Sequence, residues 1–319
     1  MNVTPASRWL HRFAWLTAAL TLLLPVTTGA VVTTLRAGMV FSDWPSSDGY
    51  NMLAYPWLSS ARDQFVEHGH RLSGMTIGLV SIALAVTTWT IESRRVPRLL
   101  ALGIFGSVFA QGMLGGARVL MDEQTMALIH GDFAAGVFSL MCVFVLTTGQ
   151  GWEARVPVSD RANGRTALVI GGLLLASVVI QYFLGGVLRH LGQSWAWISH
   201  PWFALVPVVL SPLFAVAARR CGSALLVRGS NWMLMLVGSQ ALLGLVTWYV
   251  RFGVPAWGVV AEPNSISHIA ICSLHKVVGM LTLMTSVLNV VCATAVQVPA
   301  LPGVLQPRTA DGSIVGVAT

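Results

Sequence analysis

The sequence predicts an all-α membrane protein with eight transmembrane helices, arranged as two tandem four-helix bundles. Of its 319 residues, 55% are hydrophobic and only 10% are charged. The mean hydropathy of +0.72 is far too apolar for a soluble domain. Eight apolar stretches recur along the chain, each of them close to the ~20 residues that span a bilayer core as a helix.

The spans follow one another from one polar interruption to the next. The first begins after Arg8 and Arg12. We expect it to stay in the protein rather than be cleaved as a secretory signal, because eight spans in matched halves need it. A polar stretch at 149–166 separates the fourth span from the fifth. The predicted spans are 13–34, 71–91, 99–118, 126–148, 167–188, 199–218, 230–250 and 268–296.

The two halves resemble each other, which indicates an internal duplication. A Gln-x-x-x-Gly pattern occurs in three spans: Gln111 to Gly115, Gln181 to Gly185, and Gln240 to Gly244. Small residues let membrane helices approach closely, and we interpret the pattern as a packing device. We therefore predict an N-terminal bundle over 1–150, a C-terminal bundle over 151–298 and a cytoplasmic tail over 299–319.

Basic residues predict the orientation. Twelve of the 19 Lys and Arg residues lie in the N-terminus and four other polar segments: Arg8, Arg12, Arg94, Arg95, Arg98, Arg155, Arg161, Arg165, Arg219, Arg220, Arg228 and Arg308. Short loops rich in Lys and Arg face the cytoplasm, so both termini are predicted to be inside. These residues are scattered over short turns rather than gathered in one patch. The net charge of +7 therefore reports topology, and we expect no nucleic-acid partner.

Four histidines lie at or near the same end of the even-numbered spans: His70, His130, His200 and His275. An ionisable side chain at membrane depth is costly unless it is paired or ligated. Cofactor sites in four-helix bundles are built from inward residues on facing helices, and each half supplies two histidines. Two neutral imidazoles would ligate a haem iron from opposite sides. Zinc or copper would favour a cysteine, a carboxylate or a third imidazole.

Cations at the wet end of such a site would bind the haem propionates. The candidates are Arg71, Arg118, Arg189 and Lys276, and the alternative is that they are snorkelling interface residues. His268 competes with His275 for the last ligand position. We favour His275 because it lies deeper in its span.

Glu67 precedes His70 by three residues, which places both on one helix face if the helix already begins there. Trp197 holds the equivalent place in the second half. This difference indicates one reacting haem and one helper haem, although Glu67 would also suit the mere start of a helix. Asp132 lies two residues after His130, where it would orient a neighbour or serve a proton path.

These residues resemble the haem A synthase family from the first span to about residue 296. The segment Glu67-His68-Gly69-His70-Arg71 is similar to the family's Glu-x-x-His-Arg signature, and 37–45 is similar to its Gly-Leu-Ser-x-x-Asp-Trp-Pro loop. His130 and His275 fall where the family has histidines in its fourth and eighth spans, and 185–190 resembles its fifth-span exit.

The chain departs from the family pattern in three places. Phe41 and Ser47 replace an outer-loop cysteine pair. The sixth-span Gln-x-x-His-Arg becomes Trp197-Ile-Ser-His200-Pro201, and Thr33 replaces an arginine after the first span.

The resemblance implies an oxidoreductase that converts a methyl group of haem O to a formyl group, giving haem A, with water as the oxygen source. Haem O would lie between His70 and His130. Haem b, the electron-accepting cofactor, would lie between His200 and His275. Glu67 would act at the methyl group as a base or as a carboxylate that stabilises positive charge.

The resemblance also places the protein in the cell (inner) membrane, with its haem sites toward the outer face. The expected partners are haem O synthase (the farnesyltransferase), terminal oxidase assembly factors, membrane lipid and further copies of the chain in a homo-oligomer. Two other functions stay open. A diheme b-type electron carrier would not modify haem, and a transporter with structural histidines would purify colourless.

Overall fold

The structure is a computed structural model that describes residues 5–149, 152, 161–258 and 260–297. Eight helical spans within them are long and apolar enough to cross a membrane, which confirms the predicted fold class. The spans are Ala6–Leu35, Arg62–Ile91, Arg95–Leu120, Gln124–Thr148, Asn163–His190, Ser194–Cys221, Ala224–Phe252 and Ile266–Ala295. The predicted boundary at 150/151, the tail 299–319, Arg155 and Arg308 lie outside the described residues.

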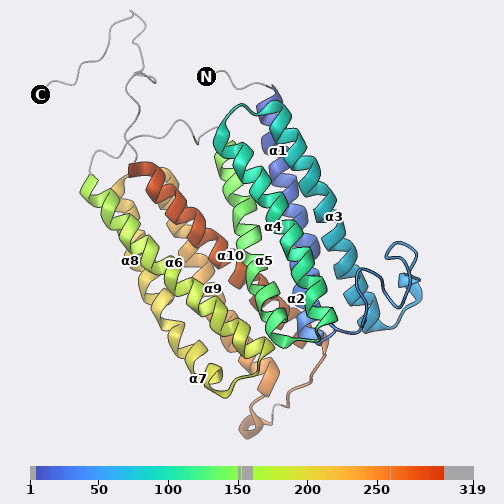
Figure 1. Ribbon diagram of the computed structural model, residues 1–319. Helices are drawn as coiled ribbons and strands as arrows, with labels where there is room; N and C mark the ends of the chain where they lie inside the picture. The colour runs from blue at the N-terminus through green and yellow to red at the C-terminus, as the bar shows by residue number, and fades with distance from the viewer. Residues whose placement is uncertain (1–4, 150–151, 153–160, 259, 298–319) are drawn as a thin grey trace, which may run out of the picture.

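Ten α-helices and three short elements build these spans and their connections over the described ranges (Figure 1). They are α1 (Pro5–Thr21), η1 (Leu22–Val26), α2 (Thr27–Leu35), η2 (Trp57–Ser59), α3 (Arg62–Ile91), α4 (Arg95–Leu120), α5 (Gln124–Thr148), α6 (Arg161–His190), α7 (Ser194–Phe203), α8 (Leu205–Cys221), α9 (Ala224–Phe252), η3 (Pro255–Trp257) and α10 (Ile266–Gln297).

The helices extend beyond the predicted spans. Hydropathy detects the part of a helix that lipid surrounds, whereas these helices continue into polar sequence outside it. Helix α3 begins at Arg62 rather than at 71, so His70 lies inside the helix and not at its start. Glu67 is therefore in its interior, one turn from His70 on the same face.

Prolines divide two of the spans. Pro25 lies in the π-helical turn η1, which joins α1 to α2. Pro201 precedes the break at Ala204 between α7 and α8. Proline lacks the backbone N–H that would bond the preceding turn, so the helix widens or bends there. Both irregular turns lie next to histidines of the predicted sites.

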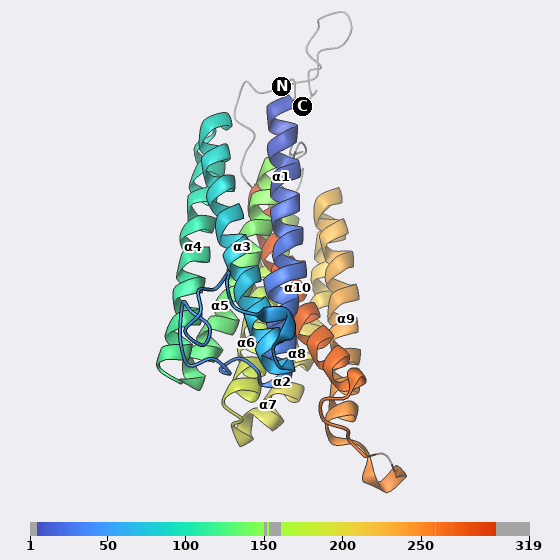
Figure 2. The same cartoon turned by 90° about the vertical axis from the view of Figure 1, so that its right-hand side faces the viewer.

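Each half forms a closed ring of four spans. In the first half, α1 and α2 pack against α3, α3 against α4, α4 against α5, and α5 against α1. In the second half, α6, α8, α9 and α10 close a ring in the same order. Figure 2 shows the long helices running side by side, with the start of α1 and the end of α10 toward the same end. The histidine-bearing spans therefore occupy opposite corners of each ring.

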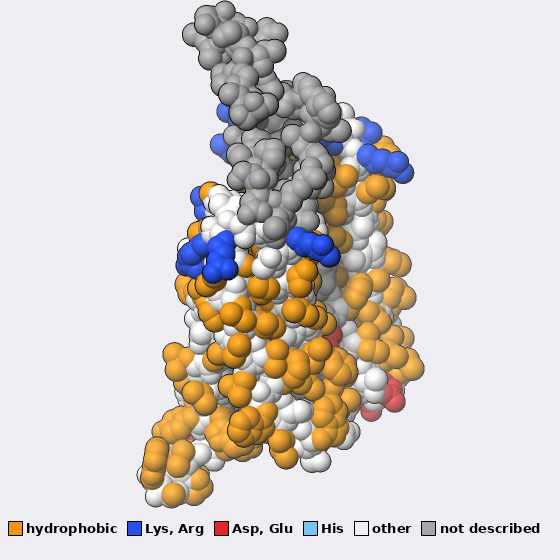
Figure 3. Space-filling view, turned by 90° about the vertical axis from the view of Figure 1, so that its left-hand side faces the viewer, with side chains coloured by type: hydrophobic (Ala, Val, Ile, Leu, Met, Phe, Trp, Pro, Cys, Tyr) orange, Lys and Arg blue, Asp and Glu red, His pale blue; other side chains and the backbone are white. Residues whose placement is uncertain are grey.

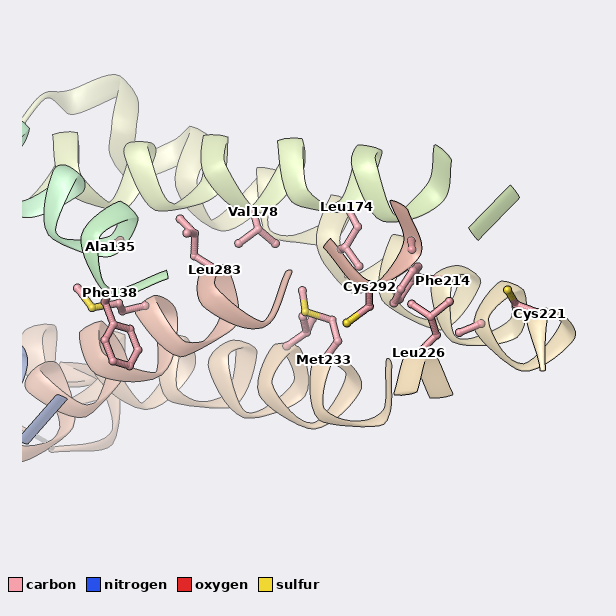
Figure 4. Close-up of a cluster of buried hydrophobic side chains, with 14 residues drawn as sticks. Ala135, Phe138, Leu174, Val178, Phe214, Cys221, Leu226, Met233, Leu283 and Cys292 are labelled. Carbon is pink, nitrogen blue, oxygen red and sulfur yellow. The ribbon is translucent and has the colours of Figure 1, made fainter. Parts of the chain in front are cut away.

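One buried cluster joins the two rings. Figure 4 shows Ala135 and Phe138 of α5 packed among residues of the second half: Leu174, Val178, Phe214, Met233 and Leu283. Helix α10 also packs against α5 and α2, and α5 packs against α6. Sequence spacing identifies the repeat but not this shared core, because the contacts join residues far apart in the chain.

The outer surface matches a lipid environment. Figure 3 shows hydrophobic side chains around the middle of the molecule and Lys and Arg side chains toward one end. Large apolar residues such as Leu79, Phe109 and Leu245 are more than half exposed. Apolar surface of this extent on a soluble monomer would be unusual.

Candidate functional site

The four predicted ligands meet as two pairs, one pair inside each ring of four helices. The ring centroids of His70 and His130 are 6.3 Å apart with their planes at 86°. Those of His200 and His275 are 6.4 Å apart at 87°. A metal–imidazole nitrogen bond is about 2 Å long, so two rings that ligate one ion from opposite sides have centroids about 6 Å apart. Both pairs have this separation.

A glycine on the preceding span faces each imidazole. A Cβ built on the glycine would lie within 2.9–3.5 Å of the ring's Cε1 in all four cases: Gly29 to His70 at 2.9 Å, Gly115 to His130 at 3.1 Å, Gly185 to His200 at 3.0 Å, and Gly244 to His275 at 3.5 Å. A side chain at Gly29, Gly115 or Gly185 would press on the ring, whereas a Cβ at Gly244 would make an ordinary contact. The glycines therefore form notches that admit the histidines.

The glutamines of the repeated pattern also contact the histidines. Gln111 donates from Nε2 to the backbone oxygen of His130 at 2.9 Å, and Gln181 does the same to His200 at 2.9 Å. The Gln240 amide lies 3.5 Å from the His275 ring. From the sequence we interpreted this pattern only as a packing device. Its contact with the histidines could have been inferred, because each glutamine lies on the span that precedes a histidine-bearing span.

The first span uses a different arrangement. Pro25 stands four residues before Gly29, where the other three spans have glutamine. Thr28 supplies the polar contact instead, with Oγ1 3.0 Å from Nδ1 of His70. A partner on Nδ1 fixes the ring orientation and leaves Nε2 for a metal.

The Glu67 carboxylate is buried at 3% exposure, with both oxygens engaged. Oε1 forms an ion pair with Arg71 at 2.8 Å and also accepts from Arg71 Nε at 3.2 Å. Oε2 accepts from the backbone amides of Val40 at 2.7 Å and Phe41 at 3.4 Å. Glu67 thus connects α3 to the outer loop, 36–61, and is held in one place.

The outer loop covers the end of the first site through several further contacts. Arg71 donates from Nη1 to the carbonyls of Asp43 at 2.8 Å and Ser46 at 2.7 Å. Arg118 donates to the carbonyl of Gly38. The Trp44 ring lies so close to Gly116 that a Cβ there would overlap it at 2.5 Å. Arg71 thus makes two hydrogen bonds to the loop backbone, whereas Arg118 makes one and its buried Nε has no partner among the described residues.

The loop is also braced from within. Asp43 accepts from the amides of Asp48 at 3.0 Å and Gly49 at 2.9 Å, which closes a turn in which both donors have positive φ. Burial raises the pKa of Asp43, but hydrogen bonds from Ser46, Gly49 and Asp48 outweigh it and lower the pKa below its usual value.

The two residues that replace the family's cysteine pair both lie against His68. Ser47 Oγ is 3.0 Å from His68 Nδ1, and the Phe41 ring is 6.2 Å from the His68 ring. Phe41 and Ser47 are almost fully buried. Packing and hydrogen bonding therefore close this part of the loop.

The second site is closed differently. Trp197, the counterpart of Glu67, packs on Phe252 at 5.0 Å and on Trp248 at 6.3 Å between ring centroids. The Arg251 guanidinium lies 5.0 Å from the Trp197 ring centroid. An aromatic and cationic cap thus replaces the carboxylate of the first site. His268 lies outside this pair and its Nδ1 is 3.4 Å from the amide of Asn264.

The remaining predicted residues lie between the two pairs. Lys276 donates from Nζ to Thr34 Oγ1 at 2.8 Å, so it reaches from α10 into the first half. Asp132 faces Gly186 of α6, with Oδ1 2.8 Å from the glycine's Cβ position. Arg189 at the end of α6 interacts electrostatically with both Asp132 and His200.

Both pairs fit a haem ligated by two histidines. The separation matches two metal–nitrogen bonds, and glycines on the neighbouring spans leave room for the imidazoles. Within the part of the chain that the structure describes, no group of three or more His, Cys, Asp or Glu could hold a metal ion. The histidines thus offer two ligands per site, as bis-histidine haem ligation requires.

The fold and these sites define a polytopic helical membrane protein with one interior imidazole pair in each half. Comparison with known proteins is consistent with this class. Residues 58–207 match the family model described as cytochrome oxidase assembly protein. A protein of Symbiobacterium thermophilum named heme A synthase is 30% identical over 255 residues, covering 70% of this chain and 80% of that protein.

Shorter matches point the same way. Proteins of Brucella ovis and Brucella abortus with the same name are 30% identical over 144 residues, which is 42% of this chain and 40% of each relative. The chain belongs to the heme A synthase family of cytochrome oxidase assembly proteins.

Proposed function

We propose that this protein is a haem A synthase, which oxidises a methyl group of haem O to a formyl group. Family membership supports the activity. We assign roles to the residues of this chain from one difference between the two sites. Both hold an opposed histidine pair, but among the described residues only the first has a buried carboxylate one turn from its ligand, at Glu67.

In this proposal haem O is the substrate of the first site, held by His70 and His130. Haem b is held by His200 and His275, and when bound it supplies a one-electron acceptor. Conversion of a methyl group and water to a formyl group releases four electrons and four protons, so a haem b in the second half would pass the electrons one at a time to a further acceptor outside the chain. The contacts of Trp197 with Phe252 place aromatic rings one helical turn from His200.

Glu67 contributes a fixed negative charge beside the substrate. Its two oxygens are both hydrogen-bonded, which suits a preorganised carboxylate that stabilises developing positive charge rather than a mobile base. Arg71 and the amides of Val40 and Phe41 prevent the carboxylate from turning away. These groups also hold the outer loop over the substrate.

The orientation follows from charge. We place both termini in the cytoplasm and the histidine pairs toward the outer face of the cell membrane, because Lys and Arg side chains gather toward one end of the molecule (Figure 3), the end at which α1 begins. Haem O synthase is then the enzyme class that supplies the substrate, and terminal oxidase assembly factors receive the product. The lipid-facing surface also allows a homo-oligomer.

The test is co-expression with a source of haem O, followed by chromatography of the extracted haems. Haem A is expected from the unaltered chain. Glu67→Ala is expected to retain haem and to accumulate haem O or a hydroxylated intermediate. A diheme electron carrier would instead contain haem b alone and form no haem A. That result would refute the proposed activity.

A further inference from the structure

Helices α3 and α4 form an apolar groove on the outer surface of the first ring. The two helices pack side by side, and residues 92–94 join them (Figure 2). The volume of the groove is about 350 Å³. One face of α3 lines it with Ile82, Ala85, Val86 and Trp89, at the spacing of successive helical turns, and α4 lines it with Leu102 and Phe105.

The groove is separate from the haem sites. Trp89 lies 19 residues after His70 on the same helix, which is about 28 Å along its axis. The groove therefore lies toward the opposite end of α3, and its occupant is a different molecule from the one that His70 binds.

The groove opens toward lipid. Its residues belong to two membrane spans, and Ile82, Val86 and Trp89 are 46%, 59% and 51% exposed. From Ile82 to Trp89 it follows α3 for seven residues, about 10 Å. The hydrocarbon of one leaflet is about 15 Å thick, half of the bilayer core. The groove thus matches a large part of one acyl chain in length.

Arg98 closes the end of the groove nearest the turn between α3 and α4. It precedes Leu102 by four residues, so both side chains lie on the same face of α4. Its Nη2 donates to the carbonyl of Trp89 at 3.1 Å, and its guanidinium carbon lies 5.2 Å from the centroid of the Trp89 ring. These contacts hold the guanidinium beside the apolar groove.

The positive charge at this end has no protein counter-charge. Within the part of the chain that the structure describes, neither Arg98 nor Arg95 forms an ion pair, whereas Arg94 is paired with Glu92 at 2.7 Å. Nε of Arg98 is buried and has no hydrogen-bond partner there. An unbonded donor of a charged group is costly, and arginine prefers phosphate or carboxylate oxygens. The end of the groove therefore fits an anion.

We propose that this groove binds one anionic phospholipid, with an acyl chain between α3 and α4 and the phosphate group at Arg98 and Arg95. Basic pockets between membrane helices bind the head groups of anionic lipids. A plain hydrocarbon would leave the arginines without a counter-charge, and a free phosphate would leave the groove unfilled. An anionic lipid satisfies both parts of the site.

The test is native mass spectrometry of the purified full chain in non-ionic detergent. The chain is titrated with phosphatidylglycerol, or with phosphatidylcholine that carries the same acyl chains. It is expected to bind one phosphatidylglycerol about tenfold more tightly than phosphatidylcholine. Arg98→Gln is expected to weaken phosphatidylglycerol binding about tenfold, the loss of one charged hydrogen bond, and to leave phosphatidylcholine binding unchanged.

The matched control is Arg228→Gln. Arg228 is exposed and lies near the start of α9, which is the third span of the second half as α4 is of the first. Phosphatidylglycerol binding is expected to stay unchanged in this variant. Equal losses in Arg98→Gln and Arg228→Gln, or equal binding of the two lipids by the unaltered chain, would overturn the site.

A second arm tests the acyl chain. Ala85→Phe fills the groove and is expected to weaken the binding of both lipids, whereas Ala83→Phe, on an exposed residue of α3 outside the groove, is expected to have no effect. Glycerol phosphate in excess is expected not to displace the lipid, because it has no acyl chain. Displacement by glycerol phosphate would overturn the proposal in favour of a site for phosphate alone.

The same spectra detect a second copy of the chain. If Ala85→Phe separates dimers and leaves phosphatidylglycerol binding unchanged, the groove is a contact between copies and the proposal is wrong. Haem content, measured by absorbance, is expected to be normal in all four variants and shows that they fold. Because the groove lies far from His70, the lipid site and the proposed activity stand or fall separately.

Discussion

Two kinds of residue position each imidazole: a glycine, which has no side chain to displace the ring, and a polar residue, which contacts the histidine. Gly185 leaves room for the His200 ring, while Gln181 on the same helix holds the backbone carbonyl of His200. Two imidazoles that bind one metal ion tolerate little displacement. A glycine opposite the imidazole is therefore as important as the histidine itself. The same reasoning applies to the other three notches.

Replacing Gly185 by alanine is expected to weaken haem retention at the second pair. The new Cβ would lie 3.0 Å from Cε1 of His200, and such overpacking costs about 1–3 kcal/mol. Gly172→Ala on the same helix is the matched control, because its Cβ position has no atom within 4 Å. The haem content of the purified protein, read from its absorbance, checks both. Equal retention in the two variants would contradict the notch.

Removing the charge of Glu67 should slow catalysis while the haems stay bound. Glu67→Gln keeps the shape but loses the negative charge, and its NH2 group cannot accept the hydrogen bonds from Arg71, so formyl production is expected to fall about 10²–10³-fold. Glu92→Gln breaks a comparable ion pair, with Arg94 at 2.7 Å, and serves as control. Haem A and haem O in extracts are measured for both. Normal haem A output from Glu67→Gln would remove its proposed role.

At the scale of elements, the outer loop is as important as the helices. The segment 36–61 has little regular structure, yet Arg71, Glu67 and Arg118 fix its backbone at several points. Its apolar residues Phe41 and Trp44 pack inward against His68 and α4. The loop therefore behaves as part of the first site.

Asp43→Asn is expected to loosen this loop. The lowered pKa of Asp43 means that the carboxylate stabilises the folded loop above its unfolded pKa of about 3.9, and that this stability is lost as pH falls through the lower folded value. Amides at Asp48 and Gly49 should exchange faster with deuterium in the variant at neutral pH. Ser42→Ala, on an exposed neighbour, should leave the exchange unchanged. Unchanged exchange in Asp43→Asn would contradict the brace.

At the scale of the whole molecule, the two rings of helices have the same histidine geometry, but different residues surround each histidine pair. Glu67 and a polar loop close the first site, and Trp197 with Arg251 closes the second. The shared core around Phe138 keeps the rings in a fixed relation. On the proposed function, the two rings provide one site for a substrate and another for an electron acceptor.

Single histidine variants should separate the two sites. His70→Ala and His130→Ala are expected to lose haem O binding and haem A formation, while haem b remains. His200→Ala and His275→Ala are expected to lose haem b. Chromatography of haems extracted from each purified variant gives the answer. Loss of the same haem species from all four variants would contradict the division of roles.

Much of the site was predictable because the signals were local. His70, Glu67 and Arg71 follow one another at helical spacing, so their common face could be inferred from the order of residues alone. The role of Gly185 could not, because it depends on which residue of another helix lies opposite. The contacts of Arg71 and Arg118 with the outer loop were missed for the same reason.

By itself, the sequence determined the eight spans, the repeat and the four ligand candidates, because hydropathy and periodicity are properties of continuous segments. The tertiary structure alone decided how the two imidazoles of each predicted pair are placed, that glycines admit their rings, and that Glu67 is tied to the loop. Such contacts depend on how the helices pack, and packing joins residues whose separation along the chain carries no signal.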